Sequence, residues 1–255
     1  MTESARILAV ANQKGGVGKT TTVINLGAYL GQLGHRILLV DVDSQCNSSR
    51  GVTTTETADR TLYDVLVDGA RASDAVVATT VNNVSLLPAS PDLAGSEIEL
   101  LDAPQREQTL KNALAELAGE YEYVLLDCPP SLGLLTVNAL VAAEAVIVPV
   151  QCEYLALEGV GRLMDTISRI RANLNPTLRI FGLLMTMYDR RTTLSDQVAA
   201  EVRRHYPDLT FQTVIPRNVR LGEAPSFGQS IVEYDPSSLG AKAYSSLARE
   251  VAARG

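Results

Sequence analysis

The segment ANQKGGVGKTTT, residues 11–22, determines the fold of this 255-residue chain more directly than any other. It contains three closely spaced glycines, Gly15, Gly16 and Gly18. Glycine lets backbone N–H groups turn toward one anion with no Cβ in the way. Lys19 and Thr20 follow at the spacing of a phosphate-binding loop, in which the lysine reaches the β- and γ-phosphates and the threonine hydroxyl binds Mg²⁺. The segment therefore predicts a site for a nucleoside triphosphate and Mg²⁺.

The residues on either side place this loop between a strand and a helix. The short apolar run ILAVA spans 7–11. After the loop, apolar residues recur at helical spacing, at Val23, Leu26, Tyr29, Leu30 and Leu33. The helix would direct its positive end at the bound phosphates. We expect the nucleotide to contact the consecutive residues Lys14, Gly15, Gly16, Val17, Gly18, Lys19, Thr20 and Thr21.

Further apolar runs follow along the chain, with amphipathic stretches between most of them. The runs span 36–43, 84–89, 121–130, 145–150, 180–188 and 210–216. Continuous apolar strands that alternate with helices are typical of a parallel sheet covered on both faces. We therefore expect an α/β fold, a doubly wound, mostly parallel sheet with helices on both faces as in P-loop NTPases, in a single domain over 1–255.

Composition excludes several classes of protein. The chain has no apolar run of about 18 residues, which a membrane-spanning helix requires, and no small-residue cleavage site follows its N-terminus. Its three cysteines, Cys46, Cys128 and Cys152, form neither a disulfide framework nor paired C-x-x-C metal ligands. We expect a soluble cytoplasmic protein with reduced thiols.

Charge is distributed unevenly along the chain. The net charge is −7, but residues 160–220 contain ten arginines against five acidic residues. That segment alone carries +5, which leaves −12 for the rest. Such asymmetry indicates either a basic face on an acidic protein or an ordinary solvated helix surface.

A second lysine, Lys14, precedes the glycines, although a phosphate-binding loop requires only one. From this position the side chain projects from the outer rim of the loop, where it can reach a nucleotide held by a facing subunit. The pattern K-G-G-x-G-K-[ST] resembles that of the deviant Walker A family and, within it, the ParA/Soj chromosome and plasmid partition ATPases. The resemblance continues through the segments 12–22, 38–45, 127–140, 149–159, 214–229 and 234–244.

The resemblance implies an ATP-dependent homodimer in which Lys14, as the signature lysine, contacts the phosphates of the partner's ATP. It further implies that the dimer binds double-stranded DNA non-specifically and that a ParB-type centromere-binding protein stimulates hydrolysis. We expect a cytoplasmic, nucleoid-associated ATP hydrolase that segregates DNA, with no membrane partner.

Three aspartates end predicted strands. Asp41 and Asp43 lie on alternate residues of one run and so share a face of the extended chain. By resemblance, Asp43 positions the attacking water and acts in catalysis with Lys14 and Lys19. Asp41 supports the Mg²⁺ shell or the loop, and Asp127 resembles the Walker B aspartate that holds Mg²⁺ through a water.

The chain departs from the family pattern D-P-Q-G-N after Asp43, where it has Ser44, Gln45, Cys46 and Asn47. Ser44 frees a backbone that proline would fix, and Cys46 replaces a residue that adopts positive φ at little cost. These two changes put the rigidity of the segment in doubt. Cys46 is also the cysteine to test for reactivity.

By resemblance, an adenine pocket would be formed by Met187 with Pro216, Arg217 and Asn218. In this arrangement the apolar side chain and the proline sandwich the base, and the Asn218 amide selects adenine over guanine. Glu153 is expected to touch the neighbouring subunit or its ribose.

Arg191 and Arg220 fall where the Soj-type proteins place DNA-contacting arginines. Arg190 is expected to join them, and Arg203 and Arg204 to extend the patch. The segment has no interleaved aromatic residues and no recognition helix. Such a surface contacts phosphates and does not read bases.

Three alternatives stay open. A MinD-like regulator of division would need a membrane-binding C-terminal helix, whereas AYSSLAREVAARG has a mostly alanine apolar face with Leu247 and Val251 and is typical of a docked helix. An electron-transfer ATPase like the nitrogenase iron protein would need paired cysteines. A ParA-like ATPase that positions a protein cargo differs too little in sequence from a DNA-partitioning ATPase for the two to be distinguished.

Overall fold

An eight-stranded sheet forms the centre of the molecule in a computed structural model that describes residues 5–117, 119–153 and 156–254. The strands are β1 (Arg6–Val10), β2 (Ile37–Asp41), β3 (Val77–Ala78), β4 (Val84–Leu87), β5 (Tyr123–Asp127), β6 (Ala145–Gln151), β7 (Arg179–Tyr188) and β8 (Thr210–Pro216). Their order is β3-β4-β2-β5-β1-β6-β7-β8, and neighbouring strands are parallel except β3 and β4. The expected mostly parallel sheet is confirmed, and β3 is a strand that the apolar runs did not predict.

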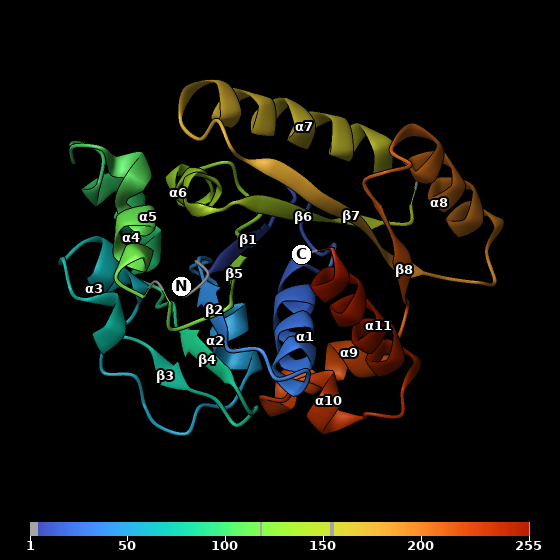
Figure 1. Cartoon of the computed structure of the whole chain (residues 1–255), viewed down its shortest axis with the longest axis horizontal. Helices are drawn as coiled ribbons and strands as arrows, with labels where there is room; N and C mark the ends of the chain where they lie inside the picture. Colours follow the sequence, from blue (N-terminus) through green and yellow to red (C-terminus); the bar gives the residue numbers. More distant parts are fainter. Residues whose placement is uncertain (1–4, 118, 154–155, 255) are drawn as a thin grey trace.

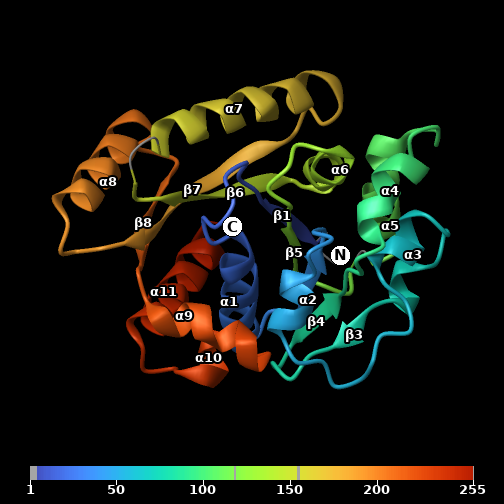
Figure 2. The ribbon, with the colours of Figure 1, turned by 180° about the vertical axis from the view of Figure 1, so that it is seen from behind.

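Helices cover both faces of this sheet (Figure 1). They are α1 (Lys19–Gln32), α2 (Asn47–Gly51), α3 (Leu62–Leu66), α4 (Leu93–Glu99), α5 (Thr109–Ala115), α6 (Leu134–Ala142), α7 (Ala156–Asn173), α8 (Thr193–His205), α9 (Val219–Glu223), α10 (Ile231–Tyr234) and α11 (Leu239–Ala253), with 3₁₀ turns at Ala72–Asp74, Arg106–Gln108 and Ala224–Phe227. Figures 1 and 2 show α6 and α7 on one side of the sheet and α1 and α11 on the other. The doubly wound arrangement is therefore confirmed. Residues 154–155, within the family-like segment 149–159, lie outside the described residues.

Two apolar layers result, one on each face. In β2, Leu38 and Val40 pack in the layer with α6 and α7, and Ile37 and Leu39 pack in the layer with α1 and α11. Successive side chains of a strand point to opposite faces, so a strand covered on both faces must be apolar at every position. This is why β2 is visible in the sequence as an unbroken apolar run.

The C-terminal segment is a docked helix, as its small apolar face predicts. Leu247 and Val251 of α11 are fully buried against the rest of the second layer. The Tyr244 and Thr22 hydroxyls lie 3.1 Å apart in the interior, which links α11 to α1. None of the helices in the described ranges combines the length and apolar character needed to cross a membrane.

The strand register brings three loops to one edge of the sheet. Asp127, the last residue of β5, pairs with Val10 of β1 on one side and with Asp41 of β2 on the other. When parallel strands end in register, the loops that follow them begin next to one another at the same edge of the sheet. The phosphate-binding loop after β1 therefore lies next to both carboxylates.

A glycine in β7 gives a test of this packing. A Cβ on Gly182 would lie 2.4 Å from the Phe211 ring, so we expect Gly182→Ala to lower the free energy of unfolding by about 1–3 kcal/mol in urea denaturation. Gly159→Ala is the control, because a Cβ there meets no described atom within 4 Å and alanine gains up to about 1 kcal/mol in a helix. Equal stability of the two variants would show that the β7–β8 packing is looser than described.

Candidate nucleotide-binding site

The loop between β1 and α1 is shaped to receive an anion. Gly16 and Gly18 adopt φ of 72° and 92°, in the left-handed region that favours glycine. Gly18 directly precedes α1, so the unpaired N–H groups of a 14-residue helix face the loop. A Cβ at Gly15 or Gly16 would meet no described atom within 4 Å, and the tip of the loop is thus open to its surroundings.

Side chains from the neighbouring segments hold this loop in place. The Asn12 amide donates to the carbonyl of Pro149 in β6 at 2.7 Å, and its Oδ1 accepts from the Lys14 N–H at 3.0 Å. The Thr186 hydroxyl of β7 donates to the carbonyl of Val17 at 2.9 Å. Both sides of the loop are therefore fixed by the sheet.

The two lysines of the loop have opposite environments. Lys19 is 7% exposed, and its Nζ donates to the Lys14 carbonyl at 3.3 Å inside the loop. Burial lowers the pKa of Lys19, and the Asp127 carboxylate opposes this shift. The Lys14 side chain is 53% exposed and points away from the loop to Glu153, with Nζ 3.2 Å from Oε2. Lys19 thus lies in the anion cradle, whereas Lys14 lies outside it.

Asp127 has an unsatisfied carboxylate oxygen. Its Oδ2 accepts from the Ser48 hydroxyl at 2.6 Å, while the buried Oδ1 has no hydrogen-bond partner among the described residues. Burial, followed by the nearby Asp41, raises the pKa of Asp127 above its ordinary range, and the hydrogen bond from Ser48 opposes that shift. An orphaned buried oxygen beside the first turn of α1 fits a cation ligand.

Asp41 is buried beside Asp127. Its Oδ2 accepts from the Ser49 N–H at 2.8 Å and from the Ser49 hydroxyl at 2.7 Å. Its Oδ1 accepts from the Asp43 N–H at 3.2 Å. Burial raises the pKa of Asp41, and these hydrogen bonds oppose the shift. With its oxygens engaged by the chain, Asp41 is arranged to shape the segment 43–49.

These groups fit Mg²⁺ held jointly by protein and nucleotide. Mg²⁺ in phosphoryl-transfer sites takes one or two carboxylates, waters and phosphate oxygens. Within the described ranges, no group of three or more His, Cys, Asp or Glu side chains could hold a metal alone. Thr20 and Asp127 are the residues that would hold the ion, with Asp41 in support.

The segment after Asp43 shows why its sequence matters. The Asp43 carboxylate accepts from the Gln45 N–H at 3.0 Å, and Cys46 adopts φ of 56°. This is the left-handed conformation that glycine would adopt at lower cost. Cys46 is 3% exposed, its thiol donates to the Ser44 carbonyl, and burial raises its pKa. Both features disfavour the thiolate at Cys46, the cysteine that the sequence marks for a reactivity test, because a buried thiol supplies little thiolate.

A cavity of about 470 Å³ adjoins the loop. Its lining includes Gly18, Thr21, Met187, Pro216, Arg217 and Asn218. The residues expected around a base thus lie together and next to the phosphate-binding loop. The Asn218 Oδ1 accepts from the Arg220 N–H at 2.9 Å and caps α9. The amide group of Asn218 that can read a base is therefore its NH₂.

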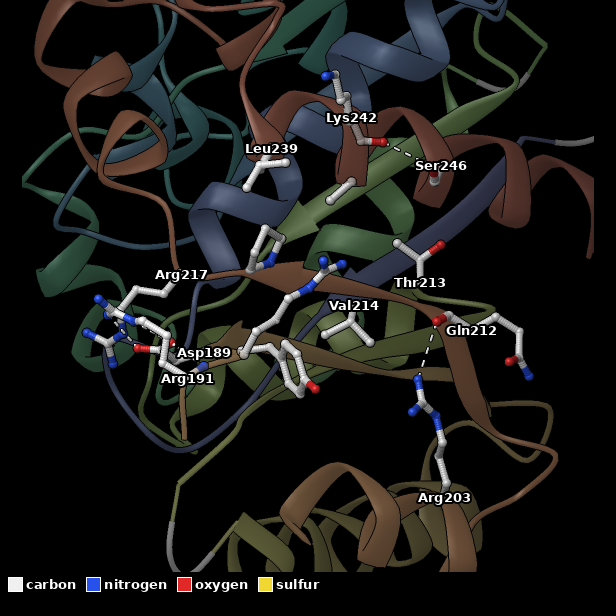
Figure 3. A pocket seen from close by; sticks show the side chains of 14 residues that line it. Asp189, Arg191, Arg203, Gln212, Thr213, Val214, Arg217, Leu239, Lys242 and Ser246 are labelled. Atoms are coloured by element: carbon white, nitrogen blue, oxygen red, sulfur yellow. Dashed lines mark hydrogen bonds and ion pairs between the residues drawn. The ribbon is translucent and has the colours of Figure 1, made fainter. Parts of the chain in front are cut away.

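A larger cavity of about 930 Å³ lies beside β8, between α8 and α11 (Figure 3). Its cationic lining consists of Arg190, Arg191, Arg203, Arg217 and Lys242. The Arg191 guanidinium donates two hydrogen bonds to the Asp189 carboxylate, at 2.9 and 2.8 Å, and the Arg191 N–H donates a third at 3.0 Å; together they hold the pKa of that carboxyl well below its usual range. Pro216 and Arg217 line this cavity as well as the smaller one.

Two arginines of the expected patch lie apart from this cavity. Arg220 pairs with Glu223 at 2.8 Å and lies 3.6 Å from Asp235, and it is absent from the residues that line the cavity. Arg204 pairs with Glu201 at 2.7 Å. The structure thus groups Arg190, Arg191 and Arg203 and adds Lys242, which sequence reasoning missed.

Several other residues of the site carried no sequence signal. Ser48 and Ser49 hold the two buried aspartates, and Thr186 anchors the loop. Serine and threonine are common in loops and at strand ends, and their roles depend on contacts distant in sequence.

Comparison with known proteins agrees with this geometry. Residues 5–180 match the model of a family described as an AAA domain. Over 252 residues the chain is 53% identical to the sporulation initiation inhibitor protein Soj of Bacillus subtilis, covering 98% of this chain and 99% of that protein. It is 54% identical to the chromosome partitioning protein ParA of Caulobacter vibrioides (strain NA1000 / CB15N), again over 252 residues, covering 98% and 94%.

A solved structure is similar along the same length. It is described as cobyrinic acid a,c-diamide synthase from Mycobacterium smegmatis with bound ADP and magnesium. It superposes with a TM-score of 0.82 at 43% identity and covers 96% of this chain and 93% of that one.

Fold and loop geometry define a P-loop ATPase, an ATP hydrolase that uses ATP and Mg²⁺. Within that class, the chain belongs to the Soj/ParA family of chromosome-partitioning ATPases.

The buried aspartates predict a pH dependence of stability. Because the pKa values of Asp41 and Asp127 are raised, the folded protein binds more protons than the unfolded chain from about pH 4 toward pH 7. Without Mg²⁺ and nucleotide, we expect the free energy of unfolding to fall as pH rises through this window. Urea denaturation at several pH values should show a smaller fall in Asp127→Asn. Parallel pH profiles for the wild type and this variant would contradict the assignment.

Proposed function

We propose that residues 1–255 act as one ATPase domain that ATP closes into a homodimer, with two nucleotides held between the subunits. The dimer binds double-stranded DNA without sequence preference and so associates with the nucleoid. A ParB-type partner stimulates hydrolysis, which opens the dimer and releases the DNA. ATP turnover then sets how long each dimer remains on the chromosome.

The environment of Lys14 carries this proposal. A lysine that served its own nucleotide would turn into the anion cradle, as Lys19 does. Lys14 instead points outward and is half-exposed, next to an open glycine tip. A facing copy of the chain could therefore place its phosphates within reach of this side chain.

Different residues of the chain have different proposed roles in phosphoryl transfer. Lys19 neutralises its own nucleotide, and Lys14 adds a cation from the partner, where charge develops in the transition state. Asp43 orients the attacking water. Asp127 and Thr20 would hold Mg²⁺, which would supply positive charge for the phosphates when bound, and Asp41 keeps the segment 43–49 in place through Ser49.

The basic cavity supports contact with a DNA backbone. Arg190, Arg191 and Arg203 line it together with Lys242, and among the described residues of its lining Asp189 is the single acidic one. Such a surface neutralises phosphates without reading bases. A dimer presents it twice, which roughly doubles the number of phosphates neutralised and steepens the salt dependence of binding.

A MinD-like membrane cycle is less well supported. Membrane binding would need an apolar helix face available to lipid. Tyr244, Leu247, Ala248 and Val251 of α11 are instead buried in the second layer of the core, and of its large apolar residues Leu239, at the start of the helix, is the exposed one. Sedimentation with liposomes in the presence of ATP separates the two functions, because a DNA-partitioning ATPase should stay in the supernatant.

A protein-cargo role differs only in the partner and would be recognised by a ParB-independent stimulation of hydrolysis.

Three substitutions separate the proposed roles. We expect Lys19→Ala to lose nucleotide binding, Lys14→Ala to bind ATP without forming the productive dimer, and Asp43→Ala to accumulate as an ATP-bound dimer on DNA. Equilibrium binding of a fluorescent ATP analogue, sizing by light scattering and ATPase assays measure these outcomes. A dimer in Lys14→Ala as stable as that of the wild type would rule out the proposed arrangement.

DNA binding gives a separate test in filter-binding titrations with ATP. Arg191→Glu and Arg203→Glu, both in the lining of the basic cavity, should each weaken binding and lower the slope of log affinity against log salt, by about 0.9 for each phosphate that the protein no longer neutralises. Arg36→Glu is the control, since this exposed residue lies at the opposite end of the strands, before β2. Affinity and slope unchanged in both arginine variants would remove DNA from the proposal.

A further inference from the structure

The ion pair between Lys14 and Glu153 has a consequence for dimer formation. We propose that Glu153 is a positioning residue that holds Lys14 in its own subunit and thereby sets the nucleotide concentration at which the dimer closes. The inference rests on the proposed function, in which Lys14 contacts the partner's nucleotide. Glu153 would then compete with the partner's triphosphate for the same ammonium group.

The geometry leaves the Lys14 side chain free to exchange partners. Its backbone N–H is fixed by Asn12 at 3.0 Å, so the position of the loop does not depend on the side chain. The ammonium group lies 3.2 Å from Glu153 Oε2, in a pair whose side chains are 53% and 44% exposed. The pair therefore forms at the surface, where a second copy can compete for it.

The Glu153 carboxylate is itself held in orientation. The Gln151 amide donates to Oε1 at 2.6 Å, and the Arg217 guanidinium lies 3.8 Å from the same oxygen. One oxygen is therefore occupied by neighbouring residues of the chain, and the other faces Lys14. The Gln151 amide also lies 3.3 Å from Met187 Sδ, and Met187 and Arg217 both line the base pocket. Through Gln151 and Arg217, the Glu153 carboxylate is thus in contact with the lining of the base pocket.

The strength of the pair sets the size of the effect. An exposed ion pair changes an equilibrium constant by about twofold to fivefold. Both subunits must release Lys14 when the dimer closes, so the dimer dissociation constant should change by about fourfold to twenty-fivefold. A triphosphate carries more negative charge than a carboxylate and therefore binds the Lys14 ammonium group more strongly. A diphosphate carries less negative charge than a triphosphate, so Glu153 competes better against ADP than against ATP, and the pair helps to keep the ADP-bound protein monomeric.

The test is the dimer fraction, measured by analytical ultracentrifugation against the concentration of a non-hydrolysable ATP analogue with Mg²⁺. We expect Glu153→Gln, which keeps the shape and removes the charge, to reach the same dimer fraction at a severalfold lower concentration of the analogue than the wild type, at equal protein concentration. It should also dimerise detectably in ADP. Lys14→Ala should remain monomeric, and Lys14→Ala with Glu153→Gln should behave like Lys14→Ala alone.

Glu144→Gln is the matched control. Glu144 is also 44% exposed and paired, with Arg179, but it lies before β6 at the opposite end of the strands. Its dimerisation should match that of the wild type. A wild type that stays monomeric with the ATP analogue would overturn the proposed function itself. If the wild type dimerises and Glu153→Gln dimerises equally well or less well, only the role of Glu153 would be overturned. Weaker dimerisation of Glu153→Gln than of the wild type would indicate instead that Glu153 contacts the partner subunit.

Discussion

The in-register end of three parallel strands is the constraint on which the rest of the site depends. Asp127 pairs with Val10 and Asp41 across β5, β1 and β2, so the three chains leave the sheet at the same level. The phosphate-binding loop and the buried carboxylates are thereby brought together before any ligand is present. A one-residue slip of β2 would turn Asp41 to the other face of the sheet and remove it from this arrangement.

The structure also connects sites that are distant in sequence. Pro216 and Arg217, at and after the end of β8, line both the base pocket and the basic cavity. Arg217 approaches Glu153, which pairs with Lys14. The proposed contacts with nucleotide, DNA and the partner subunit therefore share one short segment of chain, so a change at one of these contacts can alter the others through that segment.

Much of the fold was readable from the sequence because its strands are buried on both faces. The runs at 7–11, 36–43 and 145–150 correspond to β1, β2 and β6 within a few residues. The two-residue β3 has no periodicity to detect. In the site, loop spacing and family resemblance predicted roles for Lys14, Lys19 and the aspartates. Residues such as Ser49 and Lys242 act through contacts distant in sequence, which no local pattern encodes.

The central claim is that Lys14 acts across the interface between two copies. A crystal structure with Mg²⁺ and a non-hydrolysable ATP analogue tests it most directly, through the distance from Lys14 Nζ to the phosphate oxygens of each nucleotide. The account predicts a charge-assisted hydrogen bond of about 2.8 Å to the partner's nucleotide. A closed form in which Lys14 stays on Glu153 of its own chain, or contacts its own nucleotide, would contradict it.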